Sequence, residues 1–163
     1  MGFASAWLER SSIFPEFISE APRRGTGLIA VVPSYNEPGI TTLLDSLAAC
    51  SKPGCEAEII IVVNAPRDAS ESDLETNRKT LADIREWEKD HPGCFFRLFA
   101  IDTALLKTAD WSVGLARKAG MDEAVRRFDT LGDRNGVIIC LDADCTVSRN
   151  YFSALYEELY LRK

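Results

Sequence analysis

The sequence has little of what a zinc site or a disulfide framework needs. It contains one histidine, His91, and its five cysteines form no CxxC pair. A structural zinc site draws on several Cys and His ligands at short spacing, so we expect none here. An odd number of cysteines, several of them in apolar runs, indicates reduced core residues and favours a cytoplasmic location. These cysteines are Cys50, Cys55, Cys94, Cys140 and Cys145.

Long apolar runs and clusters of basic residues are also lacking. No stretch approaches the roughly 18 apolar residues of a membrane span, and no secretory signal is visible. Asp and Glu number 25 against 19 Lys and Arg, which gives a net charge of −6. Because no basic block stands out, we expect no nucleic-acid partner. An anionic ligand would need a local positive group or a metal ion, since the net charge repels it.

What the sequence does contain is an alternation of apolar runs and amphipathic segments, in 163 residues of which 46% are hydrophobic. Strands are predicted at 27–32, 58–63, 95–101 and 136–141, and helices at 40–50, 71–90, 112–128 and 150–161. The runs mostly do not alternate with polar residues, which is typical of strands buried on both faces. The order predicts an α/β fold, an open and mainly parallel Rossmann-like sheet with helices on both faces.

Residues 1–24 precede the first predicted strand and form an N-terminal extension to a main domain at 25–163. Trp7, Phe14 and Ile18 could line one face of a helix that ends at Pro22. We therefore expect the extension to be helical and packed on the domain. Docking to a partner or to a membrane surface is the alternative.

Ligands of open α/β sheets bind beyond the carboxyl ends of the strands, so the residues there are candidates. After the first strand, "PSYNEPG" (33–39) predicts a tight loop. In it Tyr35 can stack on a flat base, and Asn36 and Glu37 can hydrogen-bond a ribose or sugar; a plain turn with Glu37 near a helix N-terminus explains the same residues. After the second strand, Asn64 offers a donor and an acceptor, suited to an imide edge such as that of uracil; an Asx-turn is the alternative.

A basic residue interrupts the apolar stripe of the third predicted helix. At about 100° per residue, Arg117 falls among Val113, Gly120 and Met121, and Lys118 lies at the edge of the stripe. A buried Arg must be paired, so we expect Arg117 to meet a carboxylate or a phosphate.

The fourth strand runs into Asp142-Ala143-Asp144. Backbone alternation places the two carboxylates on the same side of an extended chain, where they repel each other unless a cation is bound. Oxygen ligands suit Mg²⁺ or Mn²⁺, particularly when substrate phosphates complete the coordination. Loop capping is the alternative.

Four segments in order, "VVPSYNEPG", "EIIIVVN", "VGLARKAGMDEA" and "CLDADCTVSRNYF", resemble motifs of the family 2 glycosyltransferases with the GT-A fold, over residues 27–156. The resemblance implies inverting transfer of a sugar from a nucleotide-diphosphate sugar to a glycan or another hydroxyl acceptor. The residues that would border the base and ribose are Pro33, Tyr35, Asn36 and Glu37. Asn64 would face the base, and Arg117 and Lys118 would lie close to the base or diphosphate. Asp142 would contact the ribose or donor sugar, and Asp144, with Asp142, would bind Mn²⁺ or Mg²⁺.

The sequence departs from the family pattern at three places. Asn64-Ala65 replaces a frequent Asp-Asp pair, and Cys145 replaces a frequent further acidic residue. The family's catalytic base and acceptor-binding half lie beyond Lys163. We therefore expect this chain to be the donor-binding half, without turnover by itself. The resemblance favours a UDP-sugar as donor, with a GDP-sugar as the alternative, although Asn64 lacks the acidic contact to the base that the Asp-Asp pair gives. The family implies polysaccharide biosynthesis at the cytoplasmic side, with peripheral membrane association left open for a longer protein.

Two other hypotheses about function remain open. "CLDADCTV" also fits the DxDxT pattern of haloacid dehalogenase-type Mg²⁺ phosphatases, with Asp142 as nucleophile, Asp144 as acid/base and Thr146 on the phosphate. Only 19 residues follow Asp144, and the phosphatase hypothesis does not explain "PSYNEPG". The other alternative is a non-catalytic domain that binds a nucleotide sugar.

Overall fold

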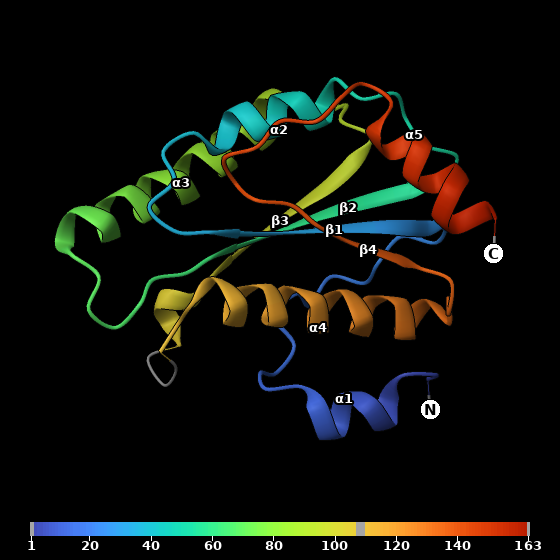
Figure 1. Cartoon of the computed structure of the whole chain (residues 1–163), viewed down its shortest axis with the longest axis horizontal. Helices are drawn as coiled ribbons and strands as arrows, with labels where there is room; N and C mark the ends of the chain where they lie inside the picture. Colours follow the sequence, from blue (N-terminus) through green and yellow to red (C-terminus); the bar gives the residue numbers. More distant parts are fainter. Residues whose placement is uncertain (1, 107–109, 163) are drawn as a thin grey trace.

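The computed structural model describes residues 2–106 and 110–162, which form an open sheet of four parallel strands in the order β3-β2-β1-β4. The strands are β1 (Thr26–Ser34), β2 (Glu56–Val63), β3 (Phe96–Asp102) and β4 (Val137–Cys140). The helices are α1 (Ser5–Ser11), α2 (Ile40–Ala48), α3 (Glu71–Asp90), α4 (Val113–Leu131) and α5 (Tyr151–Leu155), with a 3₁₀ turn at Thr103–Leu105 and a π-helical end at Tyr156–Leu161. The predicted fold class is confirmed, because the sheet is parallel and helices cover both of its faces (Figure 1).

The two central strands, β1 and β2, are buried on both faces as their composition indicates, whereas the edge strands β3 and β4 are buried only in part. All nine residues of β1 are buried, and alternate residues point into two separate clusters. On one face Leu28 and Val32 pack with residues of α2 and α3. On the other, Ile29 and Val31 pack against α4 (Figure 1). Burial of apolar area at about 25 cal/mol per Å² on both faces holds these layers together.

The strand register places the loop after β4 over the end of β1. Cys140, the last residue of β4, pairs with Val31, whereas β1 and β2 remain paired as far as Ser34 and Val63. β1 therefore continues for three residues past the end of β4. The backbone N–H of Leu141 donates to the Val31 carbonyl at 3.0 Å, and the segment that begins there can turn across the part of β1 that β4 does not pair with.

The expectation of one long N-terminal helix is wrong. The helix covers only Ser5–Ser11, Trp7 is 41% exposed, and the chain beyond Ser12 is not helical. Pro15 prevents one helix from reaching Ile18, since proline lacks a donor and disfavours helical backbone at the residue before it. Phe14 and Ile18 are nevertheless buried, in the cluster on the α4 face of the sheet.

The predicted rotation of α4 also needs correction. Val113 and Met121 are exposed and the Arg117 side chain is 37% exposed, so Arg117 does not lie in a buried stripe. The fully buried arginine is Arg127, which forms a bidentate ion pair with buried Glu58 on β2. The apolar residues predicted the wrong rotation because the buried face of α4 itself carries charged residues, Glu123 among them.

Two further expectations concern cysteines and the membrane. All five cysteines are free; Cys50 is buried, Cys140 is exposed and the others are half-buried, so the core role holds fully only for Cys50. Among the described residues, no helix combines the length and apolar character required to span a bilayer.

Candidate functional site

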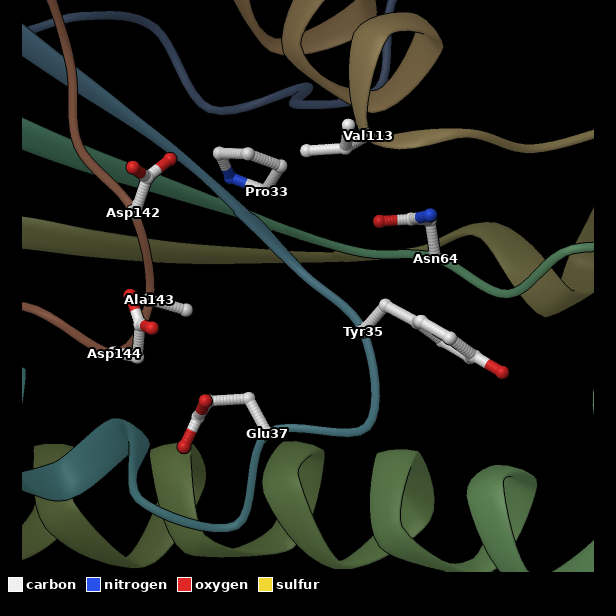
Figure 2. A pocket seen from close by; sticks show the side chains of 8 residues that line it. All are labelled: Pro33, Tyr35, Glu37, Asn64, Val113, Asp142, Ala143 and Asp144. Atoms are coloured by element: carbon white, nitrogen blue, oxygen red, sulfur yellow. The ribbon is translucent and has the colours of Figure 1, made fainter.

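A hollow of about 270 Å³ lies at the carboxyl ends of the strands (Figure 2). It is formed by the ends of β1 and β2, the segment after β4 and the first residue of α4. Its lining residues are Pro33, Tyr35, Glu37, Asn64, Val113, Asp142, Ala143 and Asp144. Six of the nine residues that the sequence singled out line this hollow; the others are Asn36, Arg117 and Lys118.

The loop after β1 carries Tyr35 at the rim of the hollow. Tyr35 is 39% exposed, and its hydroxyl donates a hydrogen bond to Asp73 Oδ2 of α3 at 2.9 Å. That bond raises the pKa of Tyr35 above its ordinary value. A hydrogen bond from Ser70, together with the one from Tyr35, lowers the pKa of Asp73. The ring is thus tethered at its far end, with its faces available for stacking on a flat ligand.

Asn36 and Glu37 shape this loop. Asn36 has a left-handed backbone, φ 50°, and its backbone N–H donates to Asn77. The Glu37 carboxylate accepts a hydrogen bond from the Gly39 N–H at 2.8 Å, directly before α2. The alternative of a plain turn with Glu37 near a helix N-terminus is therefore supported, although this residue also lines the hollow.

Asn64 is a buried polar residue of the hollow with an unpaired acceptor. Its side chain is 2% exposed, and Oδ1 has no hydrogen-bond partner among the described residues. No side-chain bond to the local backbone forms there, so the Asx-turn alternative is not observed in the described part of the chain. Figure 2 shows Oδ1 pointing towards Pro33, across the hollow. Leaving a buried acceptor unpaired costs about 1–3 kcal/mol, a cost that a ligand with a donor would remove.

The two aspartates lie along one edge of the hollow, on the segment after β4 (Figure 2). On this edge Asp142 lies nearer to Pro33 and Asp144 nearer to Glu37. Asp142 accepts a hydrogen bond from Arg117 Nη2 at 3.0 Å, so the carboxylate partner expected for Arg117 is present. Arg117 Nε is buried without a partner, and Asp144 makes no hydrogen bond or ion pair with any described residue.

Asp142 and Asp144 suit a metal ion only if a bound ligand, such as a diphosphate, supplies further oxygen atoms. No group of three or more His, Cys, Asp or Glu residues suited to a metal forms among the described residues. Mg²⁺ is commonly held by one or two carboxylates together with substrate phosphates and water. Asp144, which is free, and Asp142, which is shared with Arg117, match that donor set, and the metal would neutralise phosphate charge there.

Lys118 is not brought to the hollow. Its Nζ donates to Asp122, one turn along α4, and to the Ser11 carbonyl at 2.9 Å. It also lies 5.0 Å from the centre of the Trp7 ring. Lys118 therefore ties α1 to α4 in this structure.

Five residues at or behind the site were not predicted, among them Ala143, which lines the hollow between the two aspartates. Val113 lines the hollow because it begins α4, and Asp73, Asn77 and Thr80 of α3 hold the loop after β1. The signal for the α3 residues is their spacing of four and three positions in a polar helix. It is weak in a segment where most residues are polar.

Comparison with solved structures identifies the fold. Residues 1–349 of S. aureus TarS superpose with a TM-score of 0.54 at 20% identity, over 82% of this chain and 33% of that chain. The mannosyltransferase PcManGT from Pyrobaculum calidifontis, in complex with GDP-Man and Mn²⁺, superposes with a TM-score of 0.51 at 20% identity. The chain shares the GT-A-like fold of these structures.

The coverage of the two comparisons is unequal. PcManGT aligns with 98% of this chain, but the alignment takes in only 38% of PcManGT. The chain thus spans between 33% and 38% of the length of these two structures. No family model and no curated protein matches the sequence.

Proposed function

We propose that the hollow binds a nucleotide-diphosphate sugar and that the chain is the donor-binding half of an inverting glycosyltransferase of the family 2 type. The observation that carries the proposal is Asn64, a buried amide with an unpaired acceptor facing the hollow. It shares the hollow with an aromatic ring and two carboxylates at the carboxyl ends of the strands, where nucleotides bind in such sheets. The Mn²⁺ and GDP-Man complex of PcManGT, a protein with the same fold, supports this choice of ligand.

In this proposal each side of the hollow has its own task. The Tyr35 ring stacks on the base, and the Asn64 amide hydrogen-bonds its edge. Arg117 and the carboxylates of Asp142 and Asp144 face the diphosphate, the carboxylates through Mn²⁺ or Mg²⁺. Stabilising the charge that develops on the leaving nucleotide is the contribution expected from such groups.

The hollow accounts for the donor only, and not for the sugar acceptor or the catalytic base. Inverting transfer needs a carboxylate that takes the proton of the acceptor hydroxyl. We place that base, and the glycan or other hydroxyl acceptor, on residues outside the 25–163 domain. Polysaccharide or other glycoconjugate assembly at the cytoplasmic side is the setting that follows from the proposal.

Calorimetry with UDP and with GDP tests the donor site directly. Each nucleotide is titrated with Mn²⁺ and again with EDTA, into wild type and into Asp144→Ala. We expect one nucleotide to bind with Mn²⁺, and EDTA or Asp144→Ala to weaken it by about tenfold or more, because the carboxylate that holds the cation is lost. Asp90→Ala is the matched control, since Asp90 is an exposed carboxylate at the far end of α3.

Two results would contradict the proposal. One is a folded wild type that binds neither nucleotide. The other is equal weakening by Asp90→Ala and Asp144→Ala, which would indicate a general charge effect. A phosphatase assay on wild type and Asp142→Asn then tests the phosphatase alternative.

A further inference from the structure

The first half of α3 presents a row of polar side chains to the loop after β1. Asp73, Asn77 and Thr80 are four and three residues apart, so they lie on one face of the helix. The Tyr35 hydroxyl donates to Asp73, and Thr80 Oγ1 donates to the Glu37 carbonyl at 2.8 Å. Between these two bonds, Asn77 accepts from the Asn36 N–H. Three consecutive loop residues are thus held to one face of α3.

Asn77 differs from the other two residues because it contacts the ends of two strands. Its Oδ1 accepts from the backbone N–H of Asn36 at 2.9 Å, and its Nδ2 donates to the backbone carbonyl of Asn64 at 2.9 Å. The side chain is 7% exposed. The donor and the acceptor of the Asn77 amide are therefore both used inside the protein. Together they fix the position of Asn36, in the loop after β1, relative to Asn64 at the end of β2.

The backbone of Asn36 shows why this contact matters. Its φ of 50° is the only positive φ outside glycine among the described residues. L-residues other than glycine rarely adopt this conformation, and asparagine tolerates it best. The bond from its N–H to Asn77 stabilises this conformation and so fixes the direction in which Tyr35, the preceding residue, leaves β1.

We propose that Asn77 is a positioning residue that sets the base preference of the donor site. The inference rests on the proposed function. Asn77 fixes Tyr35, which would meet the face of the base, relative to Asn64, which would meet its edge. A hydrogen bond weakens steeply with misalignment, so a shift between the two strand ends reduces recognition of the correct base most. Asp142 and Arg117, on the phosphate side, form no hydrogen bond or ion pair with Asn77.

The test compares dissociation constants for UDP and GDP, with Mn²⁺, in wild type, Asn77→Asp and Thr80→Val. Asn77→Asp keeps the size and the acceptor but removes the donor opposite the Asn64 carbonyl. We expect wild type to prefer one nucleotide, and Asn77→Asp to weaken that nucleotide about tenfold and the other by less than about twofold. Thr80→Val loses a buried hydrogen bond from the same helix face but leaves the contact with Asn64, so its preference should match that of wild type.

A second variant covers the case in which Asn77→Asp does not fold. Tyr35→Phe keeps the ring but removes its bond to Asp73 at the half-exposed rim. We expect it to reduce the preference by about threefold. The inference alone is overturned if the Asn77 and Tyr35 variants weaken the binding of UDP and GDP equally, so that the ratio of the two dissociation constants stays unchanged. It is also overturned if wild type binds both nucleotides equally. A wild type that binds neither overturns the proposed function as well.

Discussion

Glu123 of α4 is a buried carboxylate with one oxygen left unpaired. Its Oε2 accepts a hydrogen bond from the Phe17 backbone N–H at 3.0 Å, whereas Oε1 has no hydrogen-bond partner among the described residues. Arg126 Nη1 lies 3.6 Å from Oε2. Burial outweighs these contacts and raises the pKa of Glu123 above its ordinary value of 4.5, because desolvation disfavours the charged form.

This raised pKa makes the stability depend on pH. The folded state holds the Glu123 proton more tightly than the unfolded chain does. The resulting stabilisation is complete below the ordinary pKa of 4.5 and is lost as the pH rises through the raised pKa. We expect Glu123→Gln, which keeps an acceptor for Phe17, to unfold at higher urea than wild type at about pH 7, and the difference to shrink towards pH 4.5. A difference that stays constant with pH would contradict this account.

At the same scale, individual site residues were predictable to unequal degrees. Asn64 and Asp144 were found because polar residues directly after apolar runs are unusual and have a chemical use. Asn77 was not found, because an asparagine in a charged helix looks like any solvated residue. Its role depends on two backbone groups far apart in sequence, and no local pattern reveals that.

At the scale of elements, α4 lies in close contact with the sheet at Gly120. A Cβ atom added to Gly120 would lie 2.4 Å from Val31 Cγ1 and 3.1 Å from Val62 Cγ2. Both valines belong to the buried strands β1 and β2, which cannot move aside easily. Gly114, in the first turn of the same helix, is exposed, and its nearest such neighbour is Ser112 Oγ at 3.8 Å.

The two glycines should therefore respond in opposite ways to alanine. Gly120→Ala is expected to lower the free energy of unfolding by about 1–3 kcal/mol, since overpacking outweighs the gain in helix propensity. Gly114→Ala should raise it by up to about 1 kcal/mol, because only the propensity changes. Urea denaturation of both variants measures this, and a stabilising Gly120→Ala would show that α4 can move away from the sheet.

The elements themselves were predicted well where hydrophobic burial alone determines them. The strand and helix order followed from apolar runs and helical spacing. The rotation of α4 did not, because an internal ion pair between Arg127 and Glu58 puts charge on the buried face. The length of α1 was overestimated because burial of Phe14 and Ile18 does not require a helix.

At the scale of the whole molecule, the convergence of the site residues follows from topology. Parallel strands end at one edge of the sheet, so residues 33–37, 64 and 142–144 were expected to gather there. What the sequence could not show is the offset between β1 and β4, after which Pro33 and the loop after β4 line the same hollow. Nor could it show that Lys118 turns towards α1 rather than towards the hollow.

The charge of the whole molecule makes a last prediction about ligand binding. The hollow contains the carboxylates of Glu37, Asp142 and Asp144, with Arg117 as the cation bonded to Asp142, inside a protein of net charge −6. A diphosphate entering without a divalent cation is therefore repelled locally and by the protein as a whole. Salt screens this repulsion, over a Debye length of about 10 Å at 0.1 M.

We therefore expect nucleotide binding in EDTA to strengthen as NaCl rises from about 50 to about 500 mM, because screening removes repulsion. With Mn²⁺ the sign should reverse, since salt then screens an attraction between the cation and the phosphates. Asp144→Asn should reduce the salt dependence in EDTA, whereas Asp90→Asn, far from the hollow on α3, should change it little. Calorimetry across the salt series gives both slopes. Binding in EDTA that weakens with salt would mean that Arg117, rather than the carboxylates, dominates the field in the hollow.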